Sequence, residues 1–335
     1  MTTLITDVAL TSERPGARGG RSALPQLLHW GALMLFAAIF LVFTWRSPVF
    51  MSPENLLSIV SQSAILGVLA FGLTVVVVAG GDNALAGGID LSLAATMGLT
   101  ASIYATLAQA GYHDGLAVSA ALAAGLGAGL LNAFSVTVLG MLPLLATLAT
   151  MTIATGLELV ITKNATILVE TPLTLAIGGT DGFGLPVLAY ALLIIAALFV
   201  LVTRHTTLGL NLQAVGGNPL AARASGLNVP VYVAGSYLVS GLCAAIGGLF
   251  SVSFLGASSQ GSGDMLLPII AATFLGVVFS RRLTPTIAGT LAATLFIGML
   301  INGFQLLYVS SYWVNGIQGV LTLLVVAITT PRARR

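Results

Sequence analysis

Long, almost uncharged apolar stretches fill most of this 335-residue sequence, and nearly all of the charged residues lie between them. Hydrophobic residues make up 57% of the chain and charged residues 7%. Typical soluble domains contain about 45–50% hydrophobic and about 25% charged residues. A soluble fold therefore could not cover this much apolar surface with so few charged residues. Because a membrane-spanning helix needs about 20 mainly apolar residues, the sequence predicts an all-α, polytopic integral membrane protein.

The apolar stretches are long enough for about ten transmembrane helices, of which the eighth is short. They lie at residues 27–45, 57–79, 91–110, 115–139, 143–162, 186–202, 230–252, 266–279, 285–304 and 312–330. An even number of spans puts both termini on one side of the membrane. The expected organisation is a tail at 1–26, a transmembrane domain at 27–330 and a basic end at 331–335.

The charges alternate in sign along the connections between these stretches. Ten of the twelve basic residues fall in segments on one side: Arg14, Arg18, Arg21, Arg204, Arg223, Arg281, Arg282, Arg332, Arg334 and Arg335. Arg46 and Lys163 fall on the other side, with the acids Glu54, Asp114, Glu170, Asp181 and Asp264. Because basic residues mark the cytoplasmic side, both termini and segment 204–229 are predicted to be cytoplasmic.

Small residues recur every four positions in the fourth stretch, at Ala121, Gly125, Gly129 and Ala133. Such a face lets helix backbones approach closely in lipid. The run from Gly129 to Phe134 is similar to the run from Met299 to Phe304 in the ninth stretch. These two spans would point in opposite directions, which predicts an inverted repeat of spans 2–5 and 7–10.

Two stretches are too polar or too rich in glycine for an ordinary helix. In residues 79–92, Asp90 or Ser92 could cap the third span by accepting its amide protons, or the segment could lie irregularly at the translocation path. In residues 206–229, Asn218 could cap a short helix that starts at Pro219 and ends at Gly226. This segment is either a docking helix for another protein or a plain connecting loop.

Four blocks of sequence, in order, resemble the bacterial ABC-importer permeases of the ribose/galactose type. They are Gly87-Gly-Ile-Asp-Leu-Ser92; Gly125-x3-Gly129-x2-Asn132 with Pro143-x3-Thr147-Leu148-x2-Met151-x4-Gly156-Leu157; Ala214-Val-Gly-Gly-Asn218-x2-Ala221-Ala222-Arg223-x-Ser225-Gly226; and Leu300-x-Asn302-Gly303 with Ser311-Tyr312-Trp313 and Gly316-x2-Gly319. The chain departs from the family pattern at Leu210, where an arginine is common, and at Ser280–Pro285, where a glycine-rich segment is usual.

The resemblance implies a permease subunit of an ATP-driven importer in the bacterial inner membrane, which is not itself an enzyme. It implies separate ATP-binding subunits that hold ATP and Mg²⁺, a second permease subunit (the same or a related chain), and an external solute-binding protein. The ATPase-coupling residues would be Gly209, Gly216, Gly217, Asn218, Ala221, Ala222, Arg223, Ser225 and Gly226. The solute would be a monosaccharide, or alternatively an autoinducer, a nucleoside or a branched-chain amino acid.

Neutral polar and aromatic side chains supply the candidates for the substrate path. They are Asn132, Asn302, Phe304, Gln305, Tyr312, Trp313 and Asn315, together with Asp90 and Ser92. Amides can exchange hydrogen bonds with sugar hydroxyls, but Asn132 and Asn302 could instead bond across helices. An ion-coupled carrier, the competing class, needs acids within the membrane, whereas Asp90 and Glu158 lie near span ends in the sequence. No catalytic or metal site is expected.

Overall fold

The computed structural model describes residues 24–81, 88–258, 262–280 and 284–310, with Trp313, Gly316, Ile317, Gly319 and Val320. Helices dominate this part of the chain. They are α1 (Leu24–Arg46), α2 (Pro53–Gly80), α3 (Leu93–Gln109), α4 (Asp114–Thr137), α5 (Pro143–Thr162), α6 (Pro172–Gly178), α7 (Val187–His205), α8 (Thr207–Gly217), α9 (Pro219–Ala224), α10 (Val229–Leu255), the 3₁₀ turn η1 (Ser262–Met265), α11 (Leu266–Phe279) and α12 (Ile287–Leu306). Strands β1 (Ile167–Leu168) and β2 (Ala257–Ser258) pair in antiparallel register.

The first nine predicted spans each coincide with a helix of the described chain, and the tenth lies almost wholly outside the described residues. Within that described part, α2, α4, α5, α7, α10 and α12 are long and apolar enough to cross a membrane. α3 and α11 are shorter, with 17 and 14 residues. The prediction of an all-α polytopic membrane protein is confirmed.

Local signals explain where several helices begin. Hydroxyl side chains at the residue before the helix accept amide protons: Ser52 Oγ accepts from Asn55 at the start of α2, and Thr286 Oγ1 accepts from Gly289 at the start of α12. Proline occupies the first helical position of α2, α5, α6 and α9, where its missing amide proton costs nothing.

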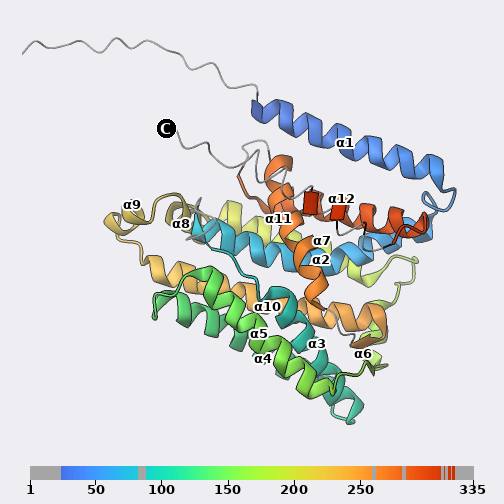
Figure 1. Ribbon diagram of the computed structural model, residues 1–335, viewed down its shortest axis with the longest axis horizontal. Helices are drawn as coiled ribbons and strands as arrows, with labels where there is room; N and C mark the ends of the chain where they lie inside the picture. The colour runs from blue at the N-terminus through green and yellow to red at the C-terminus, as the bar shows by residue number, and fades with distance from the viewer. Residues whose placement is uncertain are drawn as a thin grey trace, which may run out of the picture.

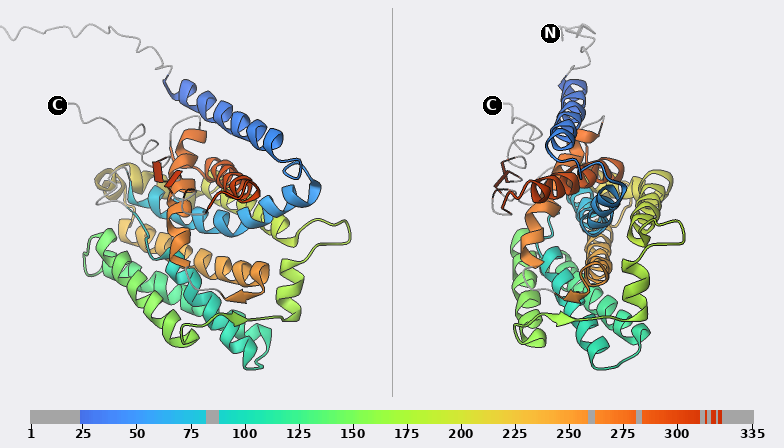
Figure 2. Two further views of the ribbon diagram at one scale, coloured as in Figure 1. Left: turned by 45° about the vertical axis from the view of Figure 1, so that its right-hand side comes forward. Right: turned by 90° about the vertical axis from the view of Figure 1, so that its right-hand side faces the viewer.

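α2 and α10 lie side by side at the centre of the bundle and run in opposite directions (Figure 1). α3 and α4 pack against α10, while α7, α11 and α12 pack against α2. α1 lies at the outside, against α11 and α12 (Figure 2). The molecule therefore has two opposite ends along the helix axes, which we name the α8–α9 end and the α6 end after the short helices found there (Figure 1).

The described charges separate between these two ends as the sequence predicted. Arg204 closes α7 and Arg223 lies in α9, so both are at the α8–α9 end. Arg46 is the last residue of α1 and Lys163 follows α5, which places them at the α6 end. The two groups of basic residues thus lie on opposite faces of the apolar layer. The remaining basic residues lie outside the described part of the chain.

Glycine brings α4 against α10 without side chains between them. All four small residues of the predicted face, Ala121, Gly125, Gly129 and Ala133, are buried. A Cβ atom at Gly125 would overlap the carbonyl oxygen of Gly241, and one at Gly241 would overlap that of Gly125. A Cβ atom at Gly129 would lie 2.6 Å from the carbonyl oxygen of Tyr237. The predicted close packing is confirmed, and α10 is the partner.

The packing supports the inverted repeat for three of its four helix pairs. α4 packs on α10 and α12 packs on α2; α3 also packs on α10 and α11 on α2. Exchanging α2, α3 and α4 with α10, α11 and α12 therefore reproduces the same neighbours. α4 and α12 run in opposite directions, as do α2 and α10 (Figure 1). The fourth pair involves residues 312–330, which lie outside the described residues except at a few positions.

Candidate functional site

Residues Gly88–Ser92, which precede α3, lie in the interior of the helical bundle. α2 ends at Gly80, and α3 begins only at Leu93. In between, Gly88–Asp90 is non-helical, and Asp90 is only 2% exposed. A Cβ atom at Gly88 would overlap the carbonyl oxygen of Val76 in α2. Irregular backbone can persist in a membrane domain when protein shields it, and here α2 and α10 do so.

Asp90 is the centre of a buried polar cluster, which we name the Asp90 cluster and which also contains Ser92, Asn132 and Ser240. Asp90 Oδ1 accepts hydrogen bonds from the Ser92 amide (2.9 Å), from Ser92 Oγ (2.6 Å) and from Asn132 Nδ2 (3.3 Å). Asp90 Oδ2 accepts one from Ser240 Oγ at 2.6 Å. Asn132 Nδ2 also donates to Ser92 Oγ at 2.9 Å. The carboxylate is therefore stabilised by neutral donors from three parts of the fold.

The position of Asp90 corrects the expectation that it lies near the end of a span. Its partner Ser240 is in the middle of the 27-residue helix α10. Tyr237, one turn before Ser240, donates from its hydroxyl to the Ile89 carbonyl at 3.4 Å. The acid is near a helix end along the sequence, but the segment carries it into the bundle.

The predicted side-chain cap of α3 is formed neither by Asp90 nor by Ser92. Asp90 accepts the amide proton of Ser92, the residue that precedes α3. The Ser92 side chain makes no capping bond to the helix. Instead, its hydroxyl donates to Asp90 and accepts from Asn132. Ser92 therefore joins α3 to α4 rather than closing the start of α3.

The candidates on α12 do not join this cluster. Asn302 is buried on α12, which packs on α2, whereas Asn132 on α4 faces α10. The Asn302 Oδ1 atom has no hydrogen-bond partner. Phe304 packs edge-on against Phe43 of α1, with ring centroids 5.3 Å apart. Gln305 and Trp313 are exposed, and Tyr312 and Asn315 lie outside the described residues.

Asn132 thus bonds from α4 to Asp90 and Ser92, the residues just before α3. Ser240 was missed because it is a single hydroxyl within an apolar stretch, without a motif around it. Its only sequence signal is its polarity at the middle of a span.

The connection between α7 and α10 forms a unit of two short helices at the α8–α9 end. Asn218 Oδ1 accepts from the amides of Leu220 (3.1 Å) and Ala221 (3.0 Å), and Gly226 has a positive φ of 86° after α9. The predicted helix at Pro219 and its cap are confirmed. α8 was not predicted: the structure shows that Thr207–Gly217 is helical, with Thr206 accepting the Gly209 amide proton at 3.4 Å.

The residues predicted to couple to an ATPase divide into two groups. Gly209, Gly216 and Ala222 are buried. The others are exposed: Gly217, Asn218, Ala221, Arg223, Ser225 and Gly226. Leu210, the departure from the family pattern, is also 61% exposed. The buried group attaches α8 and α9 to the bundle, so only the exposed group can contact another protein.

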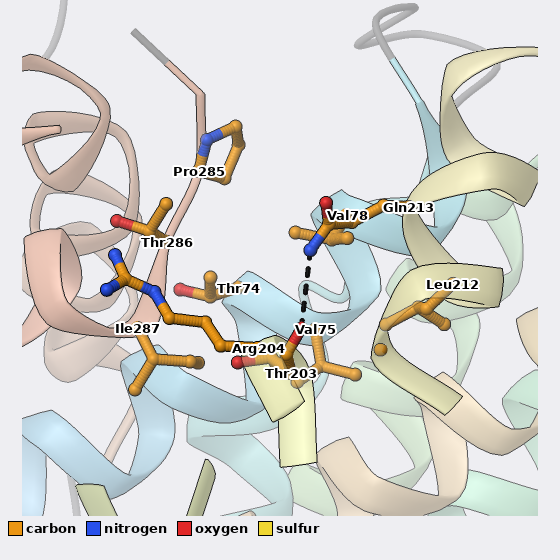
Figure 3. Close-up of a pocket in the computed structure, with 11 residues that line it drawn as sticks. Thr74, Val75, Val78, Thr203, Arg204, Leu212, Gln213, Pro285, Thr286 and Ile287 are labelled. Carbon is orange, nitrogen blue, oxygen red and sulfur yellow. Dashed lines mark hydrogen bonds between the residues drawn. The ribbon is translucent and has the colours of Figure 1, made fainter. Parts of the chain in front are cut away.

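A small pocket lies where α2, α7, α8 and α12 meet (Figure 3). Its volume is about 50 Å³. Arg204 extends toward Thr286 and Ile287, while Gln213 Nε2 donates to the Thr203 carbonyl at 3.4 Å (Figure 3). Because one water occupies about 30 Å³ in the liquid, this pocket is too small for a sugar.

A wider pocket of about 490 Å³ opens at the α6 end, between β1, α6 and the end of α10. Its lining includes the polar side chains of Glu170, Thr174 and Ser253. A pocket of this size can hold a small solute.

Comparison with known proteins gives a family match and several similar chains. Residues 55–326 match the family described as the branched-chain amino acid transport system permease component. The ribose import permease protein of Bacillus subtilis (strain 168) is 33% identical over 306 residues, which cover 88% of this chain and 90% of that protein. The galactofuranose transporter permease protein of Escherichia coli (strain K12) is 29% identical, with 84% of each chain covered. The autoinducer 2 import system permease protein of Klebsiella pneumoniae is 31% identical, with coverage of 89% and 91%.

Proposed function

This chain belongs to the family of branched-chain amino acid transport system permease components, and from that premise we propose that it is the membrane-spanning subunit of an ATP-driven importer for a small neutral solute of the monosaccharide class. The observation that carries the proposal is the match along nearly the whole transmembrane region to permeases named for ribose and galactofuranose. The chain is a transport subunit in the bacterial inner membrane, and it acts by alternating access, not by catalysis.

The chemistry of the interior favours a neutral solute. Among the described residues, the buried charged side chains are Asp90 and Glu158. Asp90 is 2% exposed and is held by four hydrogen bonds from neutral donors, so its carboxyl group is enclosed by protein and is not open to a passing solute. A charge at the centre of a membrane costs at least about 2.5–3.5 kcal/mol. A neutral, hydroxylated solute avoids this cost.

ATP hydrolysis belongs to a partner in this proposal. The exposed surface of α8 and α9, with Arg223, is the cytoplasmic docking site for an ATP-binding subunit that holds ATP and Mg²⁺. An external binding protein delivers the solute at the α6 end, where the 490 Å³ pocket opens. A second permease subunit completes the assembly. A second candidate solute is autoinducer 2, because a permease named for it is 31% identical.

Transport by the reconstituted complex tests the function. Proteoliposomes would contain this chain, its ATP-binding subunit and the external solute-binding protein, and uptake of labelled ribose, galactose, autoinducer 2, leucine and putrescine would be measured. We expect ATP-dependent accumulation of at least one of the sugars, and none without ATP. Accumulation of autoinducer 2 alone would select the second candidate. Transport of leucine or putrescine without any sugar would refute the proposal.

The orientation is tested by cysteine labelling in a Cys243→Ser background. The single native cysteine is buried in α10. Cysteines are placed at Phe183, 91% exposed at the α6 end, and at Leu220, 78% exposed in α9. In intact cells, an impermeant maleimide should label the Phe183→Cys variant. It should label the Leu220→Cys variant only after permeabilisation. The opposite pattern would reverse the orientation and remove the docking site.

A further inference from the structure

α8 rests directly on the last turn of α2, with no side chain between the two backbones. Gly216 of α8 is buried, and a Cβ atom there would overlap the Val78 carbonyl oxygen and lie 3.3 Å from the Gly81 nitrogen. Gly81, whose φ is 78°, makes the matching contact from the side of α2, since a Cβ atom on it would overlap the Gly216 carbonyl oxygen. Both positions therefore require glycine for this contact.

The same turn of α2 also touches the segment that carries Asp90. A Cβ atom at Gly88 would overlap the Val76 carbonyl oxygen and lie 3.0 Å from Val76 Cγ1. Gly88 is two residues before Asp90, whose carboxylate is bonded to α4 through Asn132 and to α10 through Ser240. The last turn of α2, Val76–Gly81, is thus held between α8 and the intramembrane segment Gly88–Ser92.

Contacts of this kind transmit displacement well. Protein interiors are close-packed and have low compressibility. Flexible side chains at an interface can change rotamer to absorb a shift, but none separates the backbones here. A movement of α8 must therefore displace the last turn of α2 or break the contact. If the last turn of α2 moves, it pushes against Gly88 and thereby changes the geometry of the hydrogen bonds of Asp90.

We propose that Gly216 is a positioning residue that transmits motion of the α8–α9 helices through the last turn of α2 to the segment Gly88–Ser92. Gly216 is too buried to contact a partner, so its role differs from that of the exposed coupling residues beside it. The inference rests on the proposed function for the source of the motion, which is the ATP-binding subunit. The segment responds by changing the hydrogen bonds of the Asp90 cluster.

The test compares Gly216→Ala with Gly235→Ala in the reconstituted complex. Gly235 is in α10, and a Cβ atom there has no heavy atom within 4 Å. We expect Gly216→Ala to lower ribose uptake per ATP hydrolysed at least tenfold while the complex still assembles and hydrolyses ATP. Gly235→Ala should keep the wild-type ratio. An unchanged ratio in Gly216→Ala would overturn the proposal, whereas a wild-type complex that transports neither a sugar nor autoinducer 2 would instead refute the proposed function.

A second measurement does not depend on how the variant folds. Hydrogen–deuterium exchange at the amides of residues 88–92 is followed in the wild-type complex, with and without a non-hydrolysable ATP analogue. We expect the analogue to change their exchange rates several-fold. Equal rates in both states would mean that the segment does not respond to the ATP-binding subunit, and the proposal would fail.

Discussion

Replacing Asp90 with leucine is expected to destabilise the membrane domain strongly, whereas Asp90→Asn is expected to leave it largely intact. In Asp90→Leu, the hydroxyls of Ser92 and Ser240 lose their acceptor inside the bundle, and Asn132 Nδ2 loses one of its two acceptors. Each buried donor left unsatisfied costs about 1–3 kcal/mol, against a total stability of about 5–15 kcal/mol. Asparagine keeps one oxygen for the bonds at Oδ1, and its amide can donate to Ser240 Oγ.

The measurement is the thermal unfolding temperature of the purified chain in detergent, together with its yield in the membrane fraction. Asp264→Leu is the matched control, because Asp264 is an exposed acid outside the long helices, where substitutions change stability by about 0.5 kcal/mol or less. We expect sugar uptake by Asp90→Asn to stay within a few-fold of the wild type, since the solute is neutral. If Asp90→Leu were as stable as the control, the Asp90 cluster would have no structural role.

Gly241→Val should prevent α4 from packing on α10 and should abolish accumulation of folded protein. The carbonyl oxygen of Gly125 occupies the place that a Cβ atom at Gly241 would need. Because the obstacle is backbone, it can be relieved only by moving one helix away from the other. Overpacking of a core typically costs about 1–3 kcal/mol and occasionally more. Here the loss of packing contacts extends along the whole interface between α4 and α10, because helix association in lipid depends on close packing.

Gly235→Val on the same helix is the control, since the space around Gly235 is open. Both variants receive the same side chain in α10, so a difference between them reports the contact with α4 and not helix propensity. Membrane yield and the elution profile in detergent would be compared for the two. Similar behaviour of the two variants would contradict the packing of α4 against α10 through glycine.

Local sequence patterns were sufficient to predict most helices and the separation of charges. Hydropathy along about 20 residues reports transfer into lipid, and this depends on the stretch itself and not on its neighbours in space. The cap at Asn218 and the helix at Pro219 were likewise predictable, because Asn218 accepts hydrogen bonds from amides only two and three residues further along the chain. The small face of α4 indicated close packing, although it could not identify α10 as the partner.

The position of Asp90 depended on the tertiary structure. Along the sequence it lies at the start of a span, yet its partner Ser240 is 150 residues away in the middle of α10. Hydropathy could not show that Gly88–Ser92 enters the bundle, because α2 and α10 supply the shielding that irregular backbone needs in a membrane.

Gly216 and Gly217 show most clearly the difference between what the sequence determined and what the tertiary structure decided. They are adjacent glycines of one motif, and both were predicted to act in coupling. The sequence by itself determined that a glycine-containing connection lies between two spans. Only the tertiary structure decided that Gly216 is packed against α2 while Gly217 faces outward with open space around it. The reason is physical: hydropathy and capping act between residues near in the chain, whereas close packing depends on which helix surfaces meet.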